Sequence, residues 1–104
     1  MDDQLNADTC CKYLKALADP ERFRIVQCLR DGSKTVGEIS RQLDSPIANV
    51  SHHLKQLRVA GLVRGHRKGR NVSYAIAAEF AGPAKRARLK VLDFGCCRIE
   101  LGKK

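Results

Sequence analysis

Signals that begin and end helices divide the first two thirds of the chain, and they limit its fold more than any other feature. Asp19 and Pro20 predict a helix capped by the Asp19 side chain, with Pro20 at the first helical position. Thr35 and Glu38 have the three-residue spacing of a capping box, which predicts a second, short helix. The chain is therefore expected to begin as a series of short helices.

Two of these predicted helices are joined by a tight turn at Asp44 and Ser45. Ser45 and Pro46 repeat the signal of a side-chain cap followed by proline, and Gly61 predicts the end of that helix after about four turns. Two short helices joined in this way describe a helix-turn-helix.

After Gly61 the pattern changes to short β-prone runs. Residues 62–67 and 71–76 flank a basic tip at 68–70, which predicts a β-hairpin. A hairpin directly after a helix-turn-helix is the winged variant. The expected fold is mainly α (α+β), a winged helix-turn-helix with about five helices and a two-stranded β-hairpin wing, in a single domain of residues 1–104.

Helical spacing of apolar residues predicts the inward faces of the remaining helices. Residues 9–18 form one expected helix, and the chain from about Pro83 forms another, weakened at Gly95. The predicted inward residues are Cys10, Leu14 and Leu17 in the first helix, Phe23, Val26, Cys28 and Leu29 in the second, Ile39 and Leu43 in the third, and Leu89, Leu92, Cys96 and Ile99 in the last.

The net charge of the chain indicates the sign of the charge on its binding partner. With 20 Lys and Arg against 11 Asp and Glu in 104 residues, the formal net charge is +9, which favours a polyanion. Residues 45–78 contain no acidic residue, so a polyanion is expected to bind there. The length excludes a two-domain enzyme. The acidic start and the lack of a long apolar run predict a cytoplasmic protein that does not insert in a membrane.

The helix from Pro46 to Ala60 has the faces that a DNA-reading helix needs. Ile47, Val50, Leu54 and Leu57 form the expected buried stripe. The opposite face carries no carboxylate and includes amide side chains that can pair with a base edge, while basic residues would contact phosphates. The predicted DNA-binding residues are Ser45, Ala48, Asn49, Ser51, His52, His53, Lys55 and Gln56 in this segment, with Arg67, Lys68 and Arg70 at the wing tip.

Two other interpretations of this helix remain open. A solvated face with two histidines occurs in many small domains. Zinc binding at His52 and His53 is less favoured, because neighbouring residues on a helix point about 100° apart and no cysteine or carboxylate lies close in sequence.

Three separate blocks of the sequence resemble the ArsR/SmtB transcriptional repressors. They are residues 14–26 (LKALADPERFRIV), residues 50–63 (VSHHLKQLRVAGLV) and residues 67–70 (RKGR), within a similar region of about residues 12–78. The resemblance implies a homodimeric winged helix-turn-helix on double-stranded operator DNA that is released when an inducer binds. It also implies that terminal helices, about residues 4–18 and 83–100, form the dimer interface.

Four of the five cysteines form two adjacent pairs, Cys10 with Cys11 and Cys96 with Cys97. By the resemblance, both pairs lie on the dimer helices. Thiolates select soft ions, so these four residues are the predicted site for a metal or metalloid inducer such as trivalent arsenic, cadmium or zinc. One cysteine of each pair also fits an apolar stripe, which leaves core packing as the alternative for Cys10 and Cys96.

The sequence departs from the best-known metal motifs of the family. No cysteine lies around residues 35–38, and the last predicted helix has no histidine. A thiol-redox or polysulfide-sensing repressor is therefore the alternative, with Cys28 as a possible partner, although its position favours core packing.

No arrangement typical of an enzyme is found: there is no Ser/His/Asp or Cys/His set, paired carboxylate motif or phosphate-binding glycine loop. The remaining alternative to a repressor is a protein-interaction or metal-buffering module that uses the same fold without binding DNA.

Overall fold

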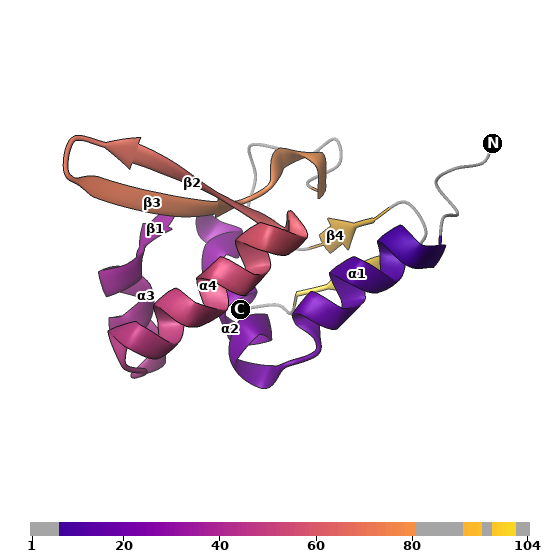
Figure 1. Ribbon diagram of the computed structural model, residues 1–104, viewed down its shortest axis with the longest axis horizontal. Helices are drawn as coiled ribbons and strands as arrows, with labels where there is room; N and C mark the ends of the chain where they lie inside the picture. The colour runs from indigo at the N-terminus through magenta and orange to yellow at the C-terminus, as the bar shows by residue number, and fades with distance from the viewer. Residues whose placement is uncertain (1–6, 81–90, 95–96, 102–104) are drawn as a thin grey trace.

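The computed structural model describes residues 7–80, 91–94 and 97–101. Its helices and strands follow one another in the order expected of a winged helix-turn-helix (Figure 1). The helices are α1 (Ala7–Leu17), α2 (Pro20–Cys28), α3 (Val36–Leu43) and α4 (Ile47–Ala60), with 3₁₀ turns at Leu29–Asp31 and Ala78–Phe80. The strands are β1 (Lys34–Thr35), β2 (Val63–Lys68), β3 (Asn71–Ile76), β4 (Val91–Asp93) and β5 (Arg98–Glu100).

Two of the predicted helix caps are confirmed. The Asp19 carboxylate accepts hydrogen bonds from the backbone amides of Glu21 and Arg22, at 2.9 and 3.2 Å, and Pro20 begins α2. At the start of α3, the Thr35 hydroxyl accepts from the Glu38 amide and the Glu38 carboxylate accepts from the Thr35 amide, which completes the capping box. These local bonds satisfy amides that the helix itself leaves unpaired.

The turn between α3 and α4 is as tight as expected, but the predicted side-chain cap at Ser45 is wrong. Asp44 takes the left-handed conformation (φ 53°), and Pro46 is the N-cap of α4 with no side-chain hydrogen bond. Ser45 instead pairs with Ser40 across the turn: its amide donates to the Ser40 carbonyl at 3.1 Å, and the Ser40 hydroxyl donates to the Ser45 carbonyl at 2.6 Å.

The predicted hairpin is confirmed and gains a third strand. β2 and β3 pair antiparallel from Val63 opposite Ile76 to Lys68 opposite Asn71, with a two-residue turn between them. Gly69 in this turn has φ 61°, a left-handed conformation that glycine adopts without strain. The two-residue strand β1 adds to β3, so the order is β1-β3-β2.

α4 lies against the centre of the hydrophobic core. Val50, Leu54 and Leu57 are fully buried, as predicted, and pack with residues that include Ile25 and Ile39. The prediction for Ile47 is wrong, because its side chain is 57% exposed in the first turn of α4. The buried stripe therefore begins at the second turn of the helix.

The helix predicted from about Pro83 is wrong in the part of this region that the structure describes. Residues 91–93 and 98–100 form an antiparallel hairpin, β4–β5, and the Phe94 amide donates to the Cys97 carbonyl across its turn at 2.9 Å. Leu92 is fully buried, so the predicted inward position was right although the element was not. Residues 83–90, 95 and 96 lie outside the described residues.

α1 and the β4–β5 hairpin cover one end of the core together (Figure 1). Tyr13 of α1 contacts the rings of Phe80 and Phe94, with centroids 4.9 and 5.2 Å away. Cys10 and Leu17 are buried as predicted, but Leu14 is 39% exposed, which corrects its expected inward position. We call α1 with the β4–β5 hairpin the end layer.

Candidate nucleic-acid interface

The outer face of α4 is polar and accessible. The core contacts of Val50, Leu54 and Leu57 fix the rotation of the helix, so the residues between them point to solvent. All but two of the residues that we predicted to bind DNA along this segment are exposed. The exposed ones are Ala48, Asn49, Ser51, His52, Lys55 and Gln56.

His53 and Ser45, the other two predicted DNA-binding residues of this segment, are half-buried. His53 Nδ1 is buried without a recorded hydrogen-bond partner. An electrostatic interaction with His53 is one of the smaller causes that lower the pKa of Asp19, so this side chain lies near the start of α2. The backbone of Ser45 is hydrogen-bonded to Ser40 in the α3–α4 turn. Both stay predicted DNA contacts, and both are less accessible than the exposed residues on the outer face of α4.

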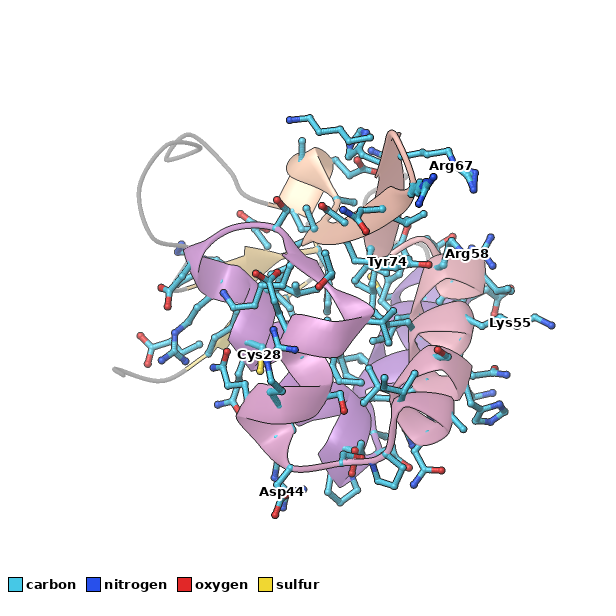
Figure 2. The ribbon with its side chains drawn as sticks, turned by 90° about the vertical axis from the view of Figure 1, so that its left-hand side faces the viewer. Cys28, Asp44, Lys55, Arg58, Arg67 and Tyr74 are labelled. Atoms are coloured by element: carbon cyan, nitrogen blue, oxygen red, sulfur yellow. The ribbon has the colours of Figure 1, made fainter. Side chains whose placement is uncertain are left out.

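The wing extends the same cationic surface. Arg67, Lys68 and Arg70 are exposed at the end of the β2–β3 hairpin. Lys55, Arg58 and Arg67 project toward the same side of the molecule (Figure 2). A helix with a basic hairpin beside it can contact a groove and the flanking phosphates at the same time.

The one acidic side chain paired with this surface lies at its edge, within the described residues. Arg64 Nη2 and Glu79 Oε2 form an ion pair at 3.0 Å. The pKa of Glu79 is lowered mainly by a hydrogen bond from its own backbone amide; burial opposes this, and the hydrogen bond and charge of Arg64 each lower the pKa by a smaller amount. Arg64 is therefore partly neutralised, and the wing-tip cations carry the uncompensated charge.

One exposed residue of this surface was missed from the sequence. Ile47 was assigned to the buried stripe, yet it lies beside Ala48 at the start of α4 and is accessible. An apolar side chain at this position can contact a thymine methyl group in a major groove. Ile47 follows directly on the turn with the left-handed Asp44 and the N-cap Pro46, and periodicity alone does not reveal that its side chain lies outside the core.

The four cysteines that the structure describes lie in four different environments. Cys10 is buried and disulfide-bonded, Cys11 is an exposed free thiol, and Cys97 is a half-buried free thiol. Cys28 is buried, as predicted, and burial raises the pKa of its thiol. Cys96 lies outside the described residues.

The described cysteines do not make a complete metal site by themselves. Within residues 7–80, 91–94 and 97–101, no three His, Cys, Asp or Glu side chains are grouped so that they could hold a metal ion. A disulfide-bonded sulfur is not a thiolate ligand, so Cys10 could contribute to such a site only after reduction. No helix in the described part of the chain is long and apolar enough to cross a membrane.

Comparison with known proteins identifies the family. Residues 17–66 match the helix-turn-helix domain family. The transcriptional repressor SdpR of Bacillus subtilis is 36% identical over 62 residues, which are 60% of this chain and 69% of SdpR. A homodimeric winged helix-turn-helix DNA-binding domain of Mycobacterium bovis, described as a possible ArsR-family transcriptional regulator, has a TM-score of 0.67 and 31% identity, covering 76% of this chain and 75% of that one. The chain belongs to the ArsR/SmtB family.

A further relative defines the extent of the similarity. The transcriptional repressor SmtB of Mycobacterium tuberculosis is 44% identical over 70 residues, which are 67% of this ArsR/SmtB-family chain and 52% of that protein. The chain thus aligns with about half the length of this relative. The relatives named here are regulators or repressors of transcription, and none is described as an enzyme.

Proposed function

We propose that this ArsR/SmtB-family protein is a sequence-specific repressor that binds double-stranded operator DNA as a homodimer in the cytoplasm. The observation that carries the proposal is the exposed, acid-free face of α4, held against the core beside a basic wing. The exposed Leu14 on α1 supports an interface between copies in the end layer, because it leaves an apolar side chain to be covered.

The two parts of the surface would have different roles. Asn49 and Gln56 carry amides that can pair bidentately with a base edge when α4 lies in the major groove. Arg67, Lys68 and Arg70 would contact phosphates, which gives affinity and register but no sequence information.

The test is binding to a DNA fragment from upstream of its own gene, measured by fluorescence anisotropy against a scrambled fragment. Gln56→Ala with His52→Ala should reduce discrimination between the fragments, with about 1–3 kcal/mol lost for a bidentate contact. Arg67→Ala with Lys68→Ala should weaken binding to both fragments alike. Arg24→Ala, an exposed arginine on α2, is the control that should leave both unchanged.

The alternative is a protein-interaction or metal-buffering module. Phosphate contacts release counterions, so affinity for the operator must fall steeply as salt rises. Binding that is equal for both fragments, or insensitive to salt, would contradict the repressor and favour the alternative.

We further propose that thiol chemistry at the two cysteine pairs releases the repressor from DNA. A soft metal or metalloid ion, such as trivalent arsenic, cadmium or zinc, would bind thiolates of Cys10, Cys11, Cys96 and Cys97 once Cys10 is reduced. The exposed Cys11 and half-buried Cys97 thiols support access for such an ion.

Thiol oxidation is the second candidate, and the disulfide at Cys10 favours it. Two thiols and one peroxide molecule give one disulfide and two molecules of water. In this interpretation the disulfide-bonded form is one of two states that differ in affinity for DNA.

Fully reduced protein bound to its operator should be titrated separately with arsenite, Cd²⁺, Zn²⁺ and hydrogen peroxide. A coupling of about 1–3 kcal/mol would weaken operator binding about 5- to 150-fold. Cys11→Ser with Cys97→Ser should abolish the response to an ion, and Cys10→Ser the response to peroxide, while Cys28→Ala is the control. If no reagent weakens binding, the proposal that thiol chemistry regulates the repressor is wrong, and the proposed DNA-binding function is unaffected.

A further inference from the structure

A cleft of about 320 Å³ lies where α1, α2 and α4 meet. α1 contributes Lys12 and Lys15, α2 contributes Arg22, and the C-terminal half of α4 contributes Gln56 and Val59. None of these side chains has a role in the surface described above except Gln56.

The cleft is cationic and has no carboxylate in its lining. The Arg22 Nε donates to the Ala16 carbonyl at 2.6 Å, which holds its guanidinium at the junction of α1 and α2. Lys12 and Lys15 are exposed, and no ion pair is recorded for either within the described residues. Asp19, at the start of α2, is an acidic residue close to Arg22, because the charge of Arg22 is one of the causes that lower the pKa of Asp19.

The cleft continues the surface that α4 presents to DNA. Gln56 belongs to both, because it lies on the outer face of α4 and also lines the cleft. α4 lies between the β2–β3 hairpin and α1 (Figure 1), so the cleft flanks α4 on the side away from the wing. Positive charge is thus placed on both sides of the helix.

We infer that Lys12, Lys15 and Arg22 bind the phosphate backbone of the operator on the side of α4 opposite the wing. The inference rests on the proposed DNA-binding function and adds a second set of phosphate contacts to it. A helix that lies in the major groove has phosphates at both groove edges, and only one edge is served by the wing. Val59, which also lines the cleft and is 71% exposed, is uncharged and does not neutralise these cations.

The test compares charge removal with charge retention at the same positions. Lys12→Gln with Lys15→Gln should weaken operator and scrambled DNA alike, by about ten-fold or more at moderate salt. It should also reduce the slope of log affinity against log salt by about 1 for each phosphate that the variant no longer binds. Lys12→Arg with Lys15→Arg keeps both charges and should bind as the wild type does.

A matched control separates local phosphate binding from the reduction of net charge. Arg24→Gln removes one charge from an exposed position outside the cleft, and in contrast to Lys12→Gln or Lys15→Gln alone it should leave the salt slope unchanged. Sedimentation of each variant at the concentration used for binding measures its assembly state.

The outcomes distinguish this inference from the proposed function. If the wild type binds DNA and the glutamine variant binds with the same affinity and salt slope as the wild type, the inferred phosphate contacts are wrong and the proposed repressor function is unaffected. Equal losses in the glutamine and arginine variants, or assembly abolished only in the glutamine variant, would assign the lysines to an interface between copies and overturn the inference. Failure of the wild type to bind DNA would overturn both.

Discussion

α4 and α1 are helices of 14 and 11 residues that lie side by side, yet the protein holds them in different ways. α4 buries four residues in the centre of the core, and three of them are almost inaccessible to solvent. α1 buries Cys10 and Leu17 and leaves Leu14 partly exposed. One helix is part of the core, and the other covers its end.

The rest of the end layer is attached by buried side chains, of which Leu92 is fully inaccessible, and by a few specific aromatic and polar contacts. Phe94 meets Tyr13 of α1, and the Leu101 carbonyl accepts hydrogen bonds from the Gln27 and Arg30 side chains at 3.0 and 2.9 Å. We expect this layer to open locally at a lower free energy than global unfolding, because it covers the end of the core and its strands have three residues each. A chemical signal at the cysteines can therefore act on the end layer while the core that positions α4 stays packed.

The largest expected effect is the removal of a core side chain from α4. Leu54 is 1% exposed, so Leu54→Ala should reduce the free energy of unfolding by about 2–5 kcal/mol, because apolar burial decreases and a cavity is left behind. Leu14→Ala removes the same atoms from α1 and should cost less than about 1 kcal/mol in the monomer, since this side chain is partly exposed. Urea unfolding at two protein concentrations measures both values and separates any effect on assembly. Equal losses at the two positions would contradict the difference between the helices.

Phe94→Ala tests the end layer directly. The side chain is half-buried and contacts the rings of Tyr13 and Phe80, so its removal should cost about 1–3 kcal/mol. Hydrogen exchange should accelerate in β4, β5 and α1 far more than in α4. Uniform acceleration across the chain would show that the end layer and the core open together.

The parts of the fold that were predictable depend on bonds between near neighbours. The caps at Asp19 and Thr35, the end of α4 near Gly61 and the hairpin turn at Gly69 all use contacts within a few residues. Such signals depend only on residues close together in the sequence. The predicted DNA-facing surface could be derived from them because α4 and the wing are each formed by one continuous segment.

The errors arise where distant contacts decide the structure. The segment around Leu92 has helical spacing, but pairing with residues 98–100 gives each short strand partners, whereas Gly95 would weaken a helix there. The error at Ser45 is local instead: its backbone pairs with Ser40, five residues earlier, and Pro46 is the N-cap of α4. The half-buried position of His53 depends on its packing near α2, and the cationic cleft needs residues from three helices. No single segment of the sequence carries that information.

A smaller effect is expected from the capping box that begins α3. Thr35→Ala removes the acceptor of the Glu38 amide and should cost about 1 kcal/mol, measured by urea unfolding. Thr35→Ser keeps a hydroxyl and should recover most of the stability. Because this cap belongs to the core elements, hydrogen exchange in the end layer should change no more than it does in α3. A selective effect on β4 and β5 would indicate that the two regions are coupled through α3.

The smallest effect concerns Asp19, which joins α1 to α2. Hydrogen bonding from the Arg22 amide is the main cause that lowers the pKa of this carboxyl, with a smaller contribution from the Glu21 amide. A carboxyl whose pKa is lower in the folded state stabilises the protein above its unfolded-state pKa, and this contribution is lost as pH falls through the folded-state value. Asp19→Asn keeps an acceptor for the cap but does not titrate, so its urea midpoint should fall less than that of the wild type between about pH 5 and pH 2. Asp44→Asn is the control, because no capping hydrogen bond to Asp44 is recorded in the described part of the chain. If both variants follow the wild type over this range, the bond at the junction does not contribute to stability, and the end layer is connected to the core by its aromatic and C-terminal contacts.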